Sequence, residues 1–206
     1  MIDRVDELLD FDLALVASIV EGGSRPAPEE GDGPLPDLRG SAGPLRFVGF
    51  DEAGRGALAG PVAVGCVHVD LSGGEAGRAR ETIAEALAGL DDSKRLPLRR
   101  RETLYQAIVS IADWGLGCAS ASEIDRLGIV GACRRAARRA YAKLTAAVNV
   151  GLFDRGLSLV AEDATARLPE VRLTRGDARS LHVAAASVIA KVGRDAIMER
   201  LGERFP

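Results

Sequence analysis

The sequence has few aromatic residues, few histidines and few cysteines. Only 4% of its 206 residues are aromatic, and only two are histidines, so a site built from clustered histidines has almost no candidates. Cys66, Cys118 and Cys133 lie far apart, without CxxC spacing. This pattern predicts reduced core residues and argues against a disulfide framework or a zinc site.

No long apolar run is present either. The longest uncharged stretch, residues 56–69, has 14 residues and contains Pro61, whereas a bilayer-spanning helix needs about 20. The first twelve residues are acidic, where a secretory signal would be basic. These absences predict a cytoplasmic protein with no membrane partner.

The net charge of −3 hides an uneven distribution. Residues 1–46 carry ten acidic and four basic side chains, a net charge of −6, and the other 160 residues carry 20 acidic and 23 basic ones, a net charge of +3. A weakly positive body permits contacts with phosphates but does not require them.

The N-terminal region divides into two parts. Apolar side chains recur at helical spacing over residues 2–20. Residues 21–46 contain six glycines and five prolines, which predicts a flexible linker. We therefore expect an N-terminal amphipathic helix (1–20), a linker (21–46) and a folded body (47–206).

Strand-like and helix-like segments alternate in the body. Short apolar, β-branched or small-residue runs predict strands over 46–50, 61–69, 115–120, 148–153 and 171–175. Helical patterns cover 75–90, 98–112, 121–144 (with Ser122 as its cap) and 180–201. This mixture predicts an α/β protein in which helices flank a central mixed sheet.

The most informative segment is Phe50-Asp51-Glu52-Ala53-Gly54-Arg55-Gly56. Adjacent acids at the end of a buried strand need positive charge nearby, and a divalent cation supplies it. Neighbouring side chains of a strand point to opposite faces, so both acids serve one site only if the strand bends there. Gly54 and Gly56 permit such a bend and leave backbone N–H groups exposed.

Two other interpretations of this segment compete with a metal site. An ordinary surface turn also combines acids with glycines. A dinucleotide-binding loop is excluded, because Gly54, Gly56 and Gly60 are spaced one residue too widely and a strand, not a helix, follows.

Residues 49–61, GFDEAGRGALAGP, resemble the signature of the type 2 ribonuclease H (ribonuclease HII) family. Further blocks match in the family's order: LDDSKRL (90–96), EID (123–125), GDARS (176–180) leading into AAASVIAK (184–191), and Arg194-Asp195. The resemblance covers most of residues 47–205. It implies an RNase H-like fold and a monomeric, metal-dependent endoribonuclease.

The resemblance also implies four carboxylates that hold two Mn²⁺ or Mg²⁺ ions. Asp51, Glu52 and Asp177 carry over by motif. The fourth ends a strand after the long helix, which leaves Asp154 or Asp163 as candidates, and the shorter connection favours Asp154. Two ions about 4 Å apart suit in-line hydrolysis of a phosphodiester.

The implied substrates are RNA–DNA hybrids and duplex DNA that contains ribonucleotides. In the family, the Gly-Arg-Gly backbone recognises the 2′-hydroxyl and the strand is cut on its 5′ side, leaving 3′-OH and 5′-phosphate ends. Replacing Gly54 or Gly56 by alanine is then expected to impair cleavage more than stability. The residues carried over as substrate-binding are Gly54, Arg55, Gly56, Ser93, Lys94, Ser187 and Lys191.

Some features lie outside the family pattern. Arg134, Arg135, Arg138 and Arg139 recur at helical spacing and predict a solvated face with diffuse attraction for nucleic acid. Family members normally continue with a segment whose tyrosine stacks under the sugar at an RNA–DNA junction, and the sequence ends without one. This absence favours one alternative, a non-catalytic or impaired nucleic-acid-binding member of the family. A second alternative is a different two-metal nuclease or integrase-like enzyme, which would share the carboxylates but not need Gly-Arg-Gly.

Overall fold

The computed structural model describes residues 4–39, 43–71, 76–159 and 168–205. Within them, five strands form one mixed sheet in the order β3-β2-β1-β4-β5. The strands are β1 (Phe47–Ala53), β2 (Val62–His68), β3 (Asp113–Ala119), β4 (Val150–Asp154) and β5 (Glu170–Leu173). β2 is antiparallel to β1 and β3, and β4 is parallel to β1 and β5. The carboxyl ends of β1, β4 and β5 therefore lie at the same end of the sheet.

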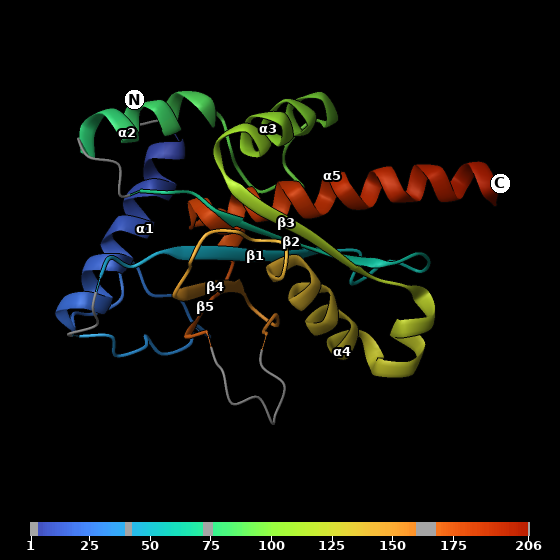
Figure 1. The fold of residues 1–206 in the computed structure, drawn as a ribbon, viewed down its shortest axis with the longest axis horizontal. Coiled ribbons are helices and arrows are strands. Elements are labelled where there is room, and N and C mark those ends of the chain that lie inside the picture. Colours follow the sequence, from blue (N-terminus) through green and yellow to red (C-terminus); the bar gives the residue numbers. More distant parts are fainter. Residues whose placement is uncertain (1–3, 40–42, 72–75, 160–167, 206) are drawn as a thin grey trace.

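Helices cover both faces of this sheet, as the sequence predicts. They are α1 (Arg4–Glu21), α2 (Ala76–Ala86), α3 (Leu98–Ile111), α4 (Ala121–Tyr141) and α5 (Leu181–Arg204). α5 and α3 lie on one side and α4 on the other (Figure 1). The α/β class with a central mixed sheet is confirmed.

Small residues bring the two main helices unusually close to the sheet. A Cβ at Gly49 or Gly65 would collide with the backbone of α5, and one at Gly117 would collide with the backbone of α4. The alanine-rich half of α5, residues 181–190, is fully buried against the strands. Backbone-to-backbone packing of this kind fills the core with few aromatic rings, which accounts for the composition.

The long helix begins at Ala121, as the sequence predicts, but its cap is a different serine. Its N-cap is Ser120 and not Ser122: the Ser120 hydroxyl accepts from the Glu123 N–H, and the Glu123 carboxylate accepts from the Ser120 N–H. Ser120 follows β3 directly in extended conformation, so the strand itself delivers the cap. The helix is interrupted at Gly128 (φ 67°, ψ 163°) and ends at Tyr141.

Two further expectations concern cysteines and membrane spans. All three cysteines are free; Cys66 and Cys133 are buried, as predicted for core residues, whereas Cys118 is only partly buried. In the described part of the chain, no helix combines the length and apolarity that crossing a bilayer requires.

The N-terminal helix packs on the body. α1 buries the apolar side chains Val5, Leu8, Leu9, Leu15 and Ile19 in the same clusters as α5 and the sheet. Asp12 is fully buried as well, and its Oδ2 lies 2.7 Å from Nδ1 of His182.

The segment after α1 has no helix or strand in its described residues, yet polar contacts attach it to the body. Asp32 accepts a hydrogen bond from the Thr174 N–H at 2.7 Å and forms ion pairs with Arg25 and Arg179 at 3.2 and 3.0 Å. All three charged side chains are at most 10% exposed. The division into helix, flexible linker and body stays a prediction, and these contacts provide a way to test it.

Replacing Asp32 by alanine should destabilise the protein, because the buried guanidinium groups of Arg25 and Arg179 lose their closest carboxylate. The expected cost is about 3 kcal/mol, or a fall in Tm of roughly 6–12 °C for a chain of this length. Asp37→Ala is the matched control, since the Asp37–Arg39 pair is more than 60% exposed and should matter little. Equal Tm values for both variants would show that the segment is not attached in solution.

The stabilisation that Asp32 provides should depend on pH. Burial raises the pKa of Asp32, but hydrogen bonds from Arg179, Thr174 and Glu29 outweigh burial and lower the pKa overall. The stabilisation is therefore present above the ordinary aspartate pKa and is lost as the pH falls through the lowered value. The Tm difference between wild type and Asp32→Ala should shrink over that range.

Candidate active site

Three segments bring carboxylates together at the carboxyl ends of the parallel strands. Asp51 and Glu52 lie near the end of β1, and Asp154 is the last residue of β4. Asp177 lies in a short 3₁₀ helix, η1 (Gly176–Ala178), that follows β5. Asp154 Oδ1 accepts a hydrogen bond from the Gly176 N–H at 2.7 Å, which ties the end of β4 to η1.

The two acids of β1 point to opposite faces of the sheet. Pairing with β2 continues regularly through Asp51↔Gly65, Glu52↔Val64 and Ala53↔Ala63, so side chains alternate up to the end of the strand. The chain turns at Gly54, directly after the strand that carries the two acids and at the glycine where the sequence permits a bend; Gly54 has φ +97°. By this alternation, Asp51 faces the side of α5 and Glu52 faces the side of α4.

Burial and mutual repulsion disfavour negative charge in this cluster. Burial raises the pKa of Asp51 well above its usual value, and the carboxylates of Glu52, Asp154 and Asp177 raise it further. Burial, followed by repulsion from Asp92 and Asp154, raises the pKa of Asp177 to about 6. The pKa values of Glu52 and Asp154 are also raised, mainly by burial.

Asp92 and Lys94 extend the cluster from the loop before α3. Burial lowers the pKa of Lys94, but Asp51, Asp177, Asp92 and Asp154 together outweigh burial and raise it. Asp92 also accepts a hydrogen bond from the Lys94 N–H at 2.9 Å. Sequence reasoning missed Asp92, although it lies inside the matched LDDSKRL block.

The donor set fits a divalent cation. Among the described residues, Glu52 Oε2 is a buried oxygen with no hydrogen-bond partner, while Oε1 of the same carboxylate lies 3.6 Å from Arg55. In that same part of the chain, no three donor side chains already converge as a metal-binding group. Asp51 and Asp154 each accept a backbone hydrogen bond instead, from Glu52 and Gly176.

The two glycines of the Gly-Arg-Gly turn have different surroundings. A Cβ on Gly54 would collide with Arg194 and lie 2.8 Å from the Pro61 carbonyl, whereas one on Gly56 would meet nothing within 4 Å. Arg194 donates to the carbonyls of Pro61 and Ala59 at 2.9 and 3.1 Å, which holds the turn against α5. Arg194 is thus a positioning residue to which sequence reasoning assigned no role.

The other expected phosphate ligands lie in less open surroundings. Ser93 and Ser187 are buried, and the Ser187 hydroxyl donates to the Ala184 carbonyl at 2.8 Å. Lys191 Nζ forms a 2.7 Å ion pair with Asp195. Substrate contacts by these residues stay predictions. Asp163, the other candidate for the fourth carboxylate, lies outside the described residues.

Comparison with known proteins identifies the family. A model of the family Ribonuclease HII matches residues 48–205. The chain belongs to the ribonuclease HII family. The resemblance carried by the Gly-Arg-Gly signature is thereby confirmed.

Curated relatives and solved structures agree with this assignment. Ribonuclease HII of Geobacillus thermodenitrificans is 41% identical over 167 residues, which cover 81% of this chain but only 58% of the relative. Ribonuclease HII of Parasynechococcus marenigrum is 44% identical over 185 residues, 89% of this chain and 74% of the relative. The RNase HII structure from Archaeoglobus fulgidus, solved with PCNA, is 26% identical with a TM-score of 0.59, covering 78% of each chain. The expected RNase H-like fold is confirmed.

The surroundings of the two glycines revise the expectation for alanine variants of this ribonuclease HII family member. Gly56→Ala should reduce cleavage of a ribonucleotide-containing duplex about tenfold or more, because the Cβ projects into open space where the sugar would pack. Its free energy of unfolding should change by less than about 0.5 kcal/mol. Gly54→Ala should lose stability as well, by about 1–3 kcal/mol, because of its positive φ and the collision with Arg194.

Cleavage rates and thermal unfolding of both variants test this difference. Gly202→Ala is the matched control, since a Cβ there also meets nothing within 4 Å. Full activity of Gly56→Ala would contradict a close approach of substrate at this turn.

Proposed function

We propose that this chain is an endoribonuclease that hydrolyses the RNA strand of RNA–DNA hybrids and cuts on the 5′ side of ribonucleotides embedded in duplex DNA. The observation that supports the proposal is that Asp51, Glu52, Asp154 and Asp177 lie on segments at one end of the sheet, where burial and mutual repulsion raise their pKa values. Membership of the ribonuclease HII family supports the substrate class.

We infer that these four carboxylates hold two Mn²⁺ or Mg²⁺ ions. When bound, such ions would activate a water for in-line attack on the phosphodiester and offset charge on the leaving oxygen, giving 3′-OH and 5′-phosphate ends. The unpartnered Glu52 Oε2 and the repulsion within the cluster support this donor set. Hard carboxylate oxygens are the ligands that both cations prefer.

Other side chains suit this chemistry without a histidine base. His68 Nδ1 lies 2.6 Å from the Phe47 carbonyl, and His182 is buried against Asp12, so both rings serve the core. Lys94 lies close enough to the carboxylates for their charges to raise its pKa. Its ammonium group would offset the negative charge of a substrate phosphate bound there. The open backbone at Gly56 provides a close approach for the 2′-hydroxyl, the group that separates RNA from DNA.

The proposal predicts strict selection of ribonucleotides. With Mn²⁺, the protein should cut a DNA duplex containing one ribonucleotide, on that ribonucleotide's 5′ side, and leave an all-DNA duplex of the same sequence intact. Gel analysis of labelled strands reports both the site and the product ends. Binding of both duplexes without cleavage would favour the non-catalytic alternative. Cleavage of both would favour a different two-metal nuclease.

Replacing Asp51 or Asp177 by asparagine should abolish cleavage, a loss of about 100-fold or more, because the change removes a donor charge with little change in shape. Without metal, the Tm of each variant should equal or exceed that of wild type, since one repelling charge is gone. Mn²⁺ should raise the Tm of the wild type by mass action and raise that of the variants much less.

Asp125→Asn is the matched control, because Asp125 is an exposed acid on α4 within a matched block. It should cleave normally and respond to Mn²⁺ like wild type. Wild-type cleavage by Asp177→Asn would refute the assignment of the carboxylate cluster.

A further inference from the structure

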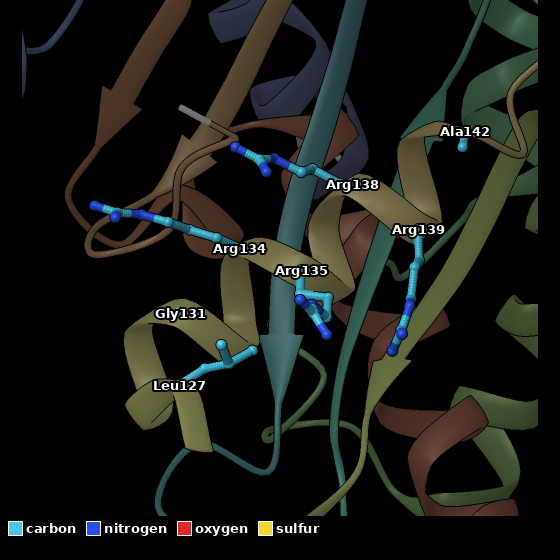
Figure 2. Close-up of a pocket in the computed structure, with 7 residues that line it drawn as sticks. All are labelled: Leu127, Gly131, Arg134, Arg135, Arg138, Arg139 and Ala142. Atoms are coloured by element: carbon cyan, nitrogen blue, oxygen red, sulfur yellow. The ribbon is translucent and has the colours of Figure 1, made fainter. Parts of the chain in front are cut away.

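A basic groove of about 490 Å³ runs along α4, outside the carboxylate cluster. We call it the arginine groove; its lining residues are Leu127, Gly131, Arg134, Arg135, Arg138, Arg139 and Ala142. Figure 2 shows Arg134 and Arg138 extending to one side of the helix, and Arg135 and Arg139 extending to the other. We propose that this groove binds the sugar–phosphate backbone of the duplex beside the cleavage site, an inference that rests on the proposed function.

The sequence of α4 forms the groove through its periodicity. Its buried face consists of small residues that pack on the sheet: Ala132, Cys133, Ala136, Ala137 and Ala140. Helical periodicity then leaves the four arginines on the opposite face. Gly131 and Ala142 leave room between the long side chains, and the interruption at Gly128 redirects the first turns of the helix.

Positive charge in the groove exceeds the negative charge that it meets. Arg135 and Arg139 share one carboxylate, Glu123, at 3.0 and 2.9 Å. Arg138 donates through Nε to the Leu159 carbonyl at 3.1 Å. Within the described residues, Arg134 has no hydrogen bond or ion pair from its side chain. Two of the four guanidinium groups therefore lack a carboxylate partner in this part of the chain.

The buried face of α4 packs beside the strands that carry the candidate active site. Cys133 precedes Arg134, and it packs in the same cluster as Phe50 and Phe153, the residues just before Asp51 and Asp154. Burial raises the pKa of the Cys133 thiol to about 11, and the Glu52 carboxylate contributes to that rise. A duplex whose scissile phosphate lies at the carboxylates therefore has backbone within reach of α4.

The charges favour nucleic acid as the occupant. The acidic N-terminal residues of this chain are engaged elsewhere, since Asp32 and Glu29 pair with Arg179 and Arg175. Arg134 and Arg138 are one helical turn, about 6 Å, apart, and guanidinium groups bind phosphates in a bidentate manner. Contacts to phosphates alone do not read bases, so the groove should bind ribonucleotide-containing and all-DNA duplexes equally.

The test compares duplex binding by wild type and by the double variant Arg134→Gln/Arg138→Gln. Fluorescence anisotropy with EDTA present measures binding without cleavage, on duplexes with and without a ribonucleotide. The double variant should bind both duplexes roughly tenfold more weakly or worse. The slope of log K against log salt should fall by about 1.8, because each lost phosphate contact removes about 0.9.

Two controls separate the groove from general charge. Arg39→Gln/Arg80→Gln also removes two positive charges, from exposed ion pairs of the N-terminal region and α2, and should retain the wild-type slope. Arg134→Lys/Arg138→Lys keeps the charge and should retain most of the affinity.

Unchanged affinity and slope in the glutamine variant, or an equal loss in the Arg39/Arg80 control, would overturn the proposal. Loss of binding to polyglutamate with normal duplex binding would also overturn it, and would indicate an acidic protein partner. The binding assay needs no turnover. If the protein fails to cleave with Mn²⁺, the proposed function is refuted, but the anisotropy measurement still tests duplex binding by the groove.

Discussion

Repulsion among buried carboxylates at one end of the sheet is the constraint on which the rest of this structure depends. Asp51, Asp154 and Asp177 would separate if their segments were free to move, so the fold must hold them by other means. The parallel pairing of β1 with β4, the stacking of Phe50 on Phe153 at 4.4 Å and the hydrogen bond from Gly176 to Asp154 provide that restraint. Packing and backbone hydrogen bonds thus hold together carboxylates that repel one another.

Helix packing and the N-terminal segment add to this restraint. Glycines in the strands let α4 and α5 pack on the sheet through their backbones, which leaves little freedom for the strands to shift. On the side of η1, the acidic N-terminal segment adds a second support. Asp32 contacts Thr174 and Arg179, on either side of Asp177, and α1 contacts the Ala178 carbonyl through Arg4. Residues far from the family signature therefore help to position one of its carboxylates.

The regular alternation of β1 gives the site two sides. By this alternation Asp51 lies on the side of α5 and Glu52 on the side of α4, but the charge of Lys94 acts on both carboxylates. A duplex placed across the end of the sheet would meet carboxylates on both sides of β1. The exposed arginines of α4 are on the same side of the sheet as Glu52, which is why we propose that the arginine groove binds the duplex.

The sequence by itself determined the α/β class, most element positions, the family and the location of Asp51 and Glu52 at a strand end. These features depend on short windows: periodicity, turn residues and a contiguous signature. It favoured Asp154 over Asp163 by loop length, and that choice stays a prediction, because Asp163 lies outside the described residues. Only the tertiary structure decided that Asp92 joins the carboxylates and that Ser120 caps α4. It also decided that Arg194 holds the glycine turn, and which arginines of α4 lack a carboxylate partner among the described residues. Each of these depends on which distant polar groups meet after packing, and no local pattern encodes that.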